Sequence, residues 1–188
     1  MRDKAKSKDL CSADVIKGEE CGAHGHFEIT CMDPDGNVKW KEDFDNVVCT
    51  AGKNYMLTEA FVTANAIVGP FVGLISNQSF TAVAAADTMA SHAGWVEAGS
   101  ANTPTYSGTR ITPAWAAAAA GNIAFSANAN FSITGAGTVA GCFIVYGTGA
   151  SSTIANTSGT LWSAGLFTSG NKAANNGDTV SVSYSTGM

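Results

Sequence analysis

The stretch that decides the fold is HFEITCMDPDGNVKW, residues 26–40. Every second residue from Phe27 to Cys31 is apolar, so these side chains share one face of an extended strand. Asp33-Pro34-Asp35-Gly36 follows, and Asp, Pro and Gly are typical of tight turns. The alternation resumes with Val38 and Trp40. The stretch therefore predicts a β-hairpin.

Four later segments have the same short, alternating or β-branched character, and turn residues bound each of them. They are Phe125 to Ile133, Thr138 to Tyr146, Thr160 to Phe167 and Thr179 to Tyr184. The turns are Gly135-Ala136-Gly137, Gly147-Thr148-Gly149 and Asn175-Asn176-Gly177-Asp178. Short strands separated by Gly and Asn turns predict a mainly β fold, with a β-sandwich or jelly-roll-like body.

The segment between the hairpin and these strands contains the one helix that we expect. Leu57, Phe61 and Ala64 recur at helical spacing, which predicts an amphipathic helix near residues 54–64, with Thr50 and Asn54 as possible caps. Gly69-Pro70 ends it, and the apolar run from Phe71 to Ile75 predicts a buried strand.

Two further segments are less regular. In the small apolar segment from Ala82 to Ala90, Asp87 is placed to cap a short helical turn that runs through Ser91, and Trp95 and Val96 begin an extended piece. Ala116 to Ala120 is too short to form a stable helix between Pro113 and Gly121, so we expect an extended strand before a hairpin.

Charge divides the chain into two parts. Residues 1–60 hold eight of the ten Lys and Arg and twelve of the fifteen Asp and Glu. The other five charged residues are Asp87, Glu97, Arg110, Lys172 and Asp178. We expect residues 1–25 to form an extended amino-terminal arm and residues 26–188 to form one domain. A body with so little charge offers DNA little electrostatic attraction, so we expect no direct contact with nucleic acid.

Neither a membrane span nor a secretory signal is expected. The longest apolar runs are shorter than the roughly 18 residues that a membrane helix needs, and the charged start lacks the apolar core of a signal peptide. We therefore expect folding in a reducing cytoplasm. The five cysteines are Cys11, Cys21, Cys31, Cys49 and Cys142, an odd and scattered set that predicts free thiols.

The candidate metal ligands are Cys21, His24, His26 and Cys31, because thiolates and imidazoles bind zinc. Their spacing lacks the paired C-x-x-C of a zinc knuckle, so the favoured interpretation is two arm histidines and two reduced cysteines. The acidic residues Asp33, Asp35, Asp43 and Asp45 suggest calcium ligands, but the hairpin turn explains the first two better. No cofactor is therefore expected.

Catalysis has one candidate location. His92 lies near Asp87, Ser91 and Glu97, an arrangement that a hydrolase could use. The sequence has no G-x-S-x-G elbow, phosphate-binding loop or dinucleotide fingerprint. We therefore do not expect an enzyme. The four tryptophans could anchor a binding surface, but we expect most to fill the core: Trp40, Trp95, Trp115 and Trp162.

Across about residues 25–184 the chain resembles a family of small virion proteins of tailed bacteriophages. The similarity is strongest in Gly25 to Trp40, Asn46-Val47-Val48 with Gly52-Lys53-Asn54, Gly73-Leu74-Ile75-Ser76 and Asp87 to Trp95. It continues in Gly137 to Phe143, Leu161 to Phe167 and Gly177-Asp178-Thr179. These positions are of the kinds that form turns, core aromatics and strand edges, and no catalytic residue can be transferred onto them.

The resemblance implies a virion component, either a head decoration protein or a tail-associated protein. The leading hypothesis is an oligomeric capsid decoration, or cement, protein on the outer capsid surface, with the major capsid protein as its partner. In it, Arg2, Lys4, Lys6 and Lys8 would contact acidic capsid patches. The alternative is a tail or fibre-associated adhesin that binds the host surface, and the second alternative is a virion-associated hydrolase.

Overall fold

In the computed structural model, which describes residues 22–61 and 68–187, the predicted hairpin is present. It consists of β1 (His24–Met32) and β2 (Val38–Asp45), which run antiparallel. Asp33 Oδ1 accepts hydrogen bonds from the backbone N–H groups of Asp35 (3.0 Å) and Asn37 (2.8 Å), which holds the turn. Strand β1 begins at His24 rather than His26, and residues 1–21 of the predicted arm lie outside the described residues.

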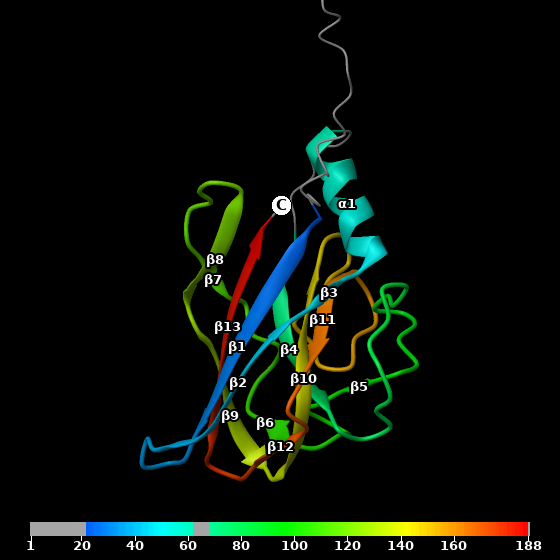
Figure 1. Ribbon diagram of the computed structural model, residues 1–188. Coiled ribbons are helices and arrows are strands. Elements are labelled where there is room, and N and C mark those ends of the chain that lie inside the picture. Colours follow the sequence, from blue (N-terminus) through cyan, green and yellow to red (C-terminus); the bar gives the residue numbers. More distant parts are fainter. Residues whose placement is uncertain (1–21, 62–67, 188) are drawn as a thin grey trace, which may run out of the picture.

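The first sheet grows outward from this hairpin (Figure 1). Strand β1 also pairs with β13 (Thr179–Gly187), whose other edge pairs with β8 (Asn122–Ala127) and β9 (Ala129–Gly135). The short strands β7 (Ala114–Trp115) and β6 (Thr105–Tyr106) pair with β8 and β9. The strand predicted over 125–133 is therefore two strands, interrupted at Asn128.

The second sheet is centred on β10 (Gly137–Tyr146). It pairs with β4 (Phe71–Ser76), β11 (Thr160–Leu166) and β12 (Lys172–Ala174). Strand β5 (Val96–Glu97) pairs with β4, and β3 (Val47–Val48) pairs with β11. All these pairings are antiparallel. The turns at 135–137 and 175–178 carry the chain from one sheet to the other, so the predicted mainly β sandwich with one helix is confirmed.

The second sheet is buried on both faces. Cys142 and Ile144 point into the main core between the sheets, together with Phe27, Phe131 and Tyr184. Their neighbours Phe143 and Val145 point the other way, into a second core that Met89 and Trp95 help to close. This explains the nearly continuous apolar run of β10, because a strand covered on both faces has no need of alternation.

Helix α1 (Thr50–Phe61) begins before the predicted start at 54, and residues 62–64 of the predicted range lie outside the described residues. Its contact with β11 is made through Gly52, where an added Cβ would lie 2.9 Å from the Trp162 backbone. This close approach decides which face of α1 packs against β11. Leu57, which we expected on the buried face, is 55% exposed, so that part of the prediction was wrong.

The predictions for the two less regular segments, 82–91 and 116–120, have different outcomes. Asp87 caps no helical turn: Thr88 and Ser91 form a bridge, and the Asp87 carboxylate accepts a hydrogen bond from the Ala84 N–H (3.0 Å). The strand predicted at 116–120 is only partly present: β7 ends at Trp115, the Ala116 N–H still donates to the Ala124 carbonyl, and Ala119 makes a single bridge to Asn122 before a tight turn at Ala120 and Gly121, which both have positive φ (50° and 76°). Positive φ at both central residues matches the twist of a hairpin.

The described residues contain no helix that is long and apolar enough to cross a membrane.

Candidate functional site

The zinc candidates are divided between two faces of β1. His24 and His26 lie on the outer face, where His26 Nδ1 is 2.9 Å from Asp45 Oδ1, whereas the Cys31 side chain is fully buried inside the sandwich. Successive side chains of a strand point to opposite faces, so His26 and Cys31 are not brought together. Cys21 lies outside the described residues. Within residues 22–61 and 68–187, no group of three or more His, Cys, Asp and Glu side chains could hold a metal ion.

The acidic candidates are likewise separated. Asp33 and Asp35 belong to the hairpin turn, whereas Asp43 and Asp45 lie at the other end of β2, opposite Glu28 and His26. The Asp33 carboxylate accepts hydrogen bonds from the backbone N–H groups of Asp35 and Asn37. The turn accounts for Asp33 without a cation.

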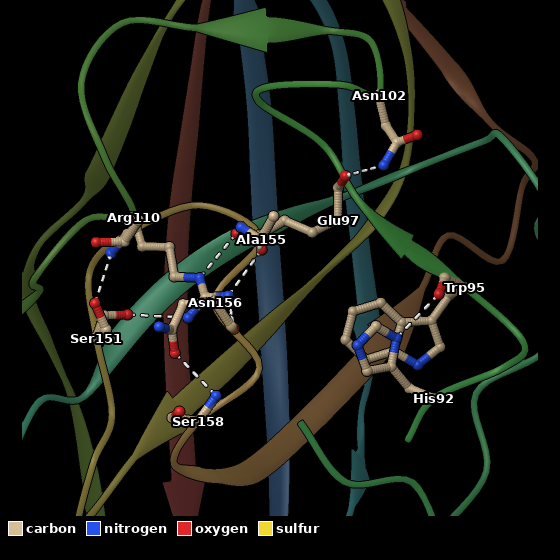
Figure 2. Close-up of polar contacts among 10 residues, drawn as sticks. His92, Trp95, Glu97, Asn102, Arg110, Ser151, Ala155, Asn156 and Ser158 are labelled. Atoms are coloured by element: carbon tan, nitrogen blue, oxygen red, sulfur yellow. Dashed lines mark hydrogen bonds and ion pairs between the residues drawn. The ribbon is translucent and has the colours of Figure 1, made fainter. Parts of the chain in front are cut away.

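The surroundings of His92 do contain a cavity, of about 180 Å³. Its walls are Met89, His92, Val96, Glu97, Asn102, Ala155, Asn156 and Thr157. Three separate segments meet here, near residues 89–102, near Arg110 and at 151–157 (Figure 2). The cavity is therefore the place where the hydrolase hypothesis can be examined.

Glu97 in this cavity is bound to Arg110 at two points. The Nε and Nη2 atoms of Arg110 donate to Oε1 and Oε2 of Glu97, at 2.8 Å each, and the side chains are 0% and 6% exposed. The Ala155 N–H also donates to Glu97 Oε2 (2.8 Å). Three donors thus occupy the Glu97 carboxylate, one on Oε1 and two on Oε2.

Arg110 uses its remaining donors on loop carbonyls, as Figure 2 shows. Nη1 donates to the Ser151 carbonyl (2.9 Å), and Nη2 donates to the Asn156 carbonyl (2.7 Å). The guanidinium carbon lies 5.3 Å from the centre of the Phe143 ring, close enough for a cation–π contact. We call Glu97, Arg110 and the loop 151–156 the Arg110 cluster. It fastens that loop to the second sheet.

His92 is held by its neighbour in the chain. Its ring stacks on Trp95, with centroids 3.9 Å apart, and its Nδ1 lies 3.0 Å from the Trp95 carbonyl oxygen. Asp87 accepts a hydrogen bond from Trp95 Nε1 (3.0 Å). The described contacts of His92 include neither Asp87 nor Glu97, so the sequence neighbours do not form a proton relay.

Arg110 was not singled out from the sequence, although a signal existed. It is the one cation between Lys53 and Lys172, and a charge within an apolar segment needs a partner if it is buried. The sequence did not reveal which carboxylate that partner would be.

Two more ion pairs involve charged residues of the body. Lys39 donates to Asp178, which also accepts hydrogen bonds from the Asn175 N–H (2.6 Å) and the Cys31 thiol (3.7 Å). Burial alone would raise the pKa of Asp178, but these donors outweigh burial and hold the pKa below its ordinary value. Lys172 lies 2.8 Å from Glu42, and the pKa of Glu42 is lowered in the same way, with burial opposing the donors Lys172 and Ser169.

The tryptophans mostly belong to the cores, as expected. Trp95 and Trp162 are buried, and Trp40 and Trp115 are half-buried. Their indole N–H groups have partners at three of the four positions: Trp40 to the Ala173 carbonyl, Trp95 to Asp87 and Trp162 to the Tyr184 hydroxyl.

Comparisons with known protein families, with curated proteins and with solved structures found no match to this chain.

Proposed function

We propose that this protein is a non-catalytic structural component of a bacteriophage particle, a decoration or cement protein bound to the outer surface of the head. The observation that carries the proposal is that the few charged side chains of the body contact other residues of the same chain. Each of the five charged residues beyond residue 60 is engaged in an internal contact: Glu97 with Arg110, Lys172 with Glu42, Asp178 with Lys39, and Asp87 with Trp95.

The region of the first sheet at β13 and β9 supports a role in neutral protein–protein contact, whereas β1 and β2 carry the exposed charges Glu28, Asp43 and Asp45. On β13 and β9, small polar side chains bind one another: Ser181 donates to Asn130 (2.7 Å) and accepts from Asn128 (3.0 Å). Covering such a surface with a partner removes no unpaired charge from water, which is the expensive part of forming an interface. A neutral region of this kind suits repeated contacts between subunits.

The Arg110 cluster supports a mechanical role. A loop that was free to move would lose conformational entropy when a partner ordered it, and this would weaken binding. The loop at 151–156 is already fixed by Arg110 and Glu97. A protein that binds the assembled shell better than its free subunits stabilises the shell by mass action.

In this proposal the protein is a homo-oligomer, its partner is the major capsid protein, and Arg2, Lys4, Lys6 and Lys8 of the arm contact acidic patches of the capsid.

The test is location and copy number in purified particles, measured by quantitative mass spectrometry of separated heads and tails and by a density map of the intact particle. We expect hundreds of copies on heads and none on purified tails. Particles that lack the protein should release DNA at a lower temperature and recover when purified protein is added back. Low copy number confined to tails, or unchanged thermal release, would contradict the proposal.

A further inference from the structure

Strand β2 is an outer edge of the first sheet. It pairs with β1 on one side, and within residues 22–61 and 68–187 no strand pairs with it on the other. The backbone N–H and C=O groups on that side can therefore pair with a strand of another chain. The side chains along the edge decide which chain that is, because opposite charges across two strands stabilise their pairing and like charges oppose it.

The register of the hairpin shows which residues of β2 direct their backbone groups to this outer edge. The Asn46 N–H donates to the Gly25 carbonyl (3.0 Å), so these two residues form a hydrogen-bonded pair. Hydrogen-bonded and non-hydrogen-bonded pairs alternate along an antiparallel ladder, so residues 44 and 42 are also bonded to β1. The residues between and beside them direct their backbone groups outward: Lys41, Asp43 and Asp45.

These outward residues carry charges of both signs. All three side chains are exposed, that of Asp43 by 81% and that of Asp45 by 91%. When β2 of a second copy lies antiparallel to this edge, with a two-fold axis at Glu42, Lys41 of each copy is directly opposite Asp43 of the other. The symmetry forms this ion pair twice. Asp43 gains from it, because the residue opposite Asp43 within its own chain is Glu28, which has the same charge.

The same charges select the register of such a pairing. A shift of two residues in one direction places Lys41 opposite Lys41 of the second copy, and the same shift in the other direction places Asp43 opposite Asp43. Like charges directly opposite each other are destabilising. A shift of one residue would place outward backbone groups opposite groups that are already bonded to β1. The edge is therefore complementary to itself in one register.

The other side chains of the edge are compatible with this register. The two Glu42 side chains that meet at the axis are buried in their own subunits, and each is paired with Lys172 at 2.8 Å, so they do not oppose each other as free charges. Two exposed apolar residues stand at the ends of the edge, Val38 (52%) and Val47 (36%). Antiparallel pairing brings the Val38 end of one copy beside the Val47 end of the other.

We propose that two copies of this protein join through their β2 edges, so that their first sheets form one continuous antiparallel sheet across a two-fold axis. The inference deepens the proposed function, on which it rests for the expectation of a homo-oligomer, by naming the surface that joins the copies. Charges on an edge strand also guard against unwanted pairing. A row of one sign would repel every further copy, whereas the two signs of β2 repel only the wrong registers.

The experiment is sedimentation velocity of the full-length protein over a range of concentrations. We expect a dimer that dissociates on dilution and weakens as sodium chloride is added, because its ion pairs are exposed. Lys41→Asp and Asp43→Lys each place like charges opposite each other at both pairs, so each variant alone should dimerise at least about tenfold more weakly. A protein that is monomeric at every concentration, or variants that associate as the unchanged protein does, would overturn the proposal.

Mixing the two variants localises the contact. In a dimer of one Lys41→Asp copy and one Asp43→Lys copy, opposite charges meet again at both pairs, so the mixture should regain the dimer that each variant alone loses. The double variant Lys41→Asp, Asp43→Lys should regain it as well. Lys53→Asp makes the same change of charge at an exposed position of α1 and is the matched control, which should dimerise as the unchanged protein does. A mixture that stays monomeric would contradict the pairing.

Failure of this inference differs from failure of the proposed function. Monomeric protein present in hundreds of copies on heads would overturn the β2 dimer and leave the capsid proposal in place. A dimer that responds to the charge variants, in a protein confined to tails, would support the β2 dimer and contradict the capsid proposal. Circular dichroism checks that each variant is folded, which is expected because the substituted side chains are exposed.

Discussion

The Arg110 guanidinium and the Glu97 carboxylate face each other in a buried, two-point ion pair, with both N–O distances at 2.8 Å. The pair joins β5 to the segment before β7, and through the Ala155 N–H and the Asn156 carbonyl it also holds the long connection between β10 and β11. The charges of Glu97 and Arg110 are thus buried, and their hydrogen bonds hold three segments of the chain together.

Removal of Arg110 should be strongly destabilising. Arg110→Met leaves the Glu97 carboxylate buried without its partner, and the cost of such an unpaired charge is about 3–5 kcal/mol. The loss in the free energy of unfolding is measured by urea titration, with circular dichroism as the signal. The double variant Arg110→Met, Glu97→Leu should lose less than the sum of the two single changes, because no charge is left unpaired. Additive losses would show that the two side chains are not coupled.

Acid should weaken the fold through Asp178. The pKa of this carboxyl lies below its ordinary value of 3.8 in the folded protein, so its ionised form stabilises the fold above that value and the stabilisation is lost as the pH falls. Asp178→Asn should therefore be less stable than the unchanged protein at pH 7, and the difference should narrow towards pH 3. The measurement is the urea midpoint at each pH. A difference independent of pH would contradict the assignment.

The described cysteines should resist alkylation in the folded protein. Burial raises the pKa of Cys31 to about 12 and that of Cys49 to about 11, and it raises the pKa of the fully buried Cys142 as well. The reactive thiolate is scarce at pH 8, so labelling with iodoacetamide should be roughly a hundredfold or more slower than in denaturant. Peptide mapping by mass spectrometry reads each site separately. Rapid native labelling at Cys142 would contradict its burial.

Strands β10 and β11 lie so close together at Gly141 that a methyl group there should destabilise the fold. An added Cβ would lie 2.0 Å from the Gly165 carbonyl oxygen, which is backbone and cannot turn aside. We expect Gly141→Ala to lower the free energy of unfolding by about 2 kcal/mol or more. Gly36→Ala is the matched control, because its φ is +85° but nothing lies within 4 Å, and it should cost only about 1 kcal/mol. Urea unfolding compares the two, and equal losses would contradict the close contact.

The long strands of the body and the turns between them were predictable to within a few residues, whereas the short strands β3, β6 and β12 were not predicted. The hairpin at 26–40 was predictable because alternation and the residues of its turn act between neighbours in the chain. Leu57 was predicted on the buried face of the helix but is exposed, because the orientation of the helix depends on how closely Gly52 approaches Trp162, a residue of a distant strand. The split of the predicted strand at Asn128 arose in the same way, since β13 pairs with β8 and β9 in turn.

The sequence by itself determined a mainly β body, its turns and the gathering of charge near the amino terminus, because alternation, turn chemistry and composition can be read from nearby residues. Only the tertiary structure decided how the few charges of the body are used. Lys39 and Asp178 are 139 positions apart, and Glu97 meets Arg110 across two segments. A cavity lined by Met56 and Glu59 of α1 likewise has walls from four strands, β7, β10, β11 and β13. Such arrangements depend on how the two sheets pack, and a local pattern carries no information on that packing.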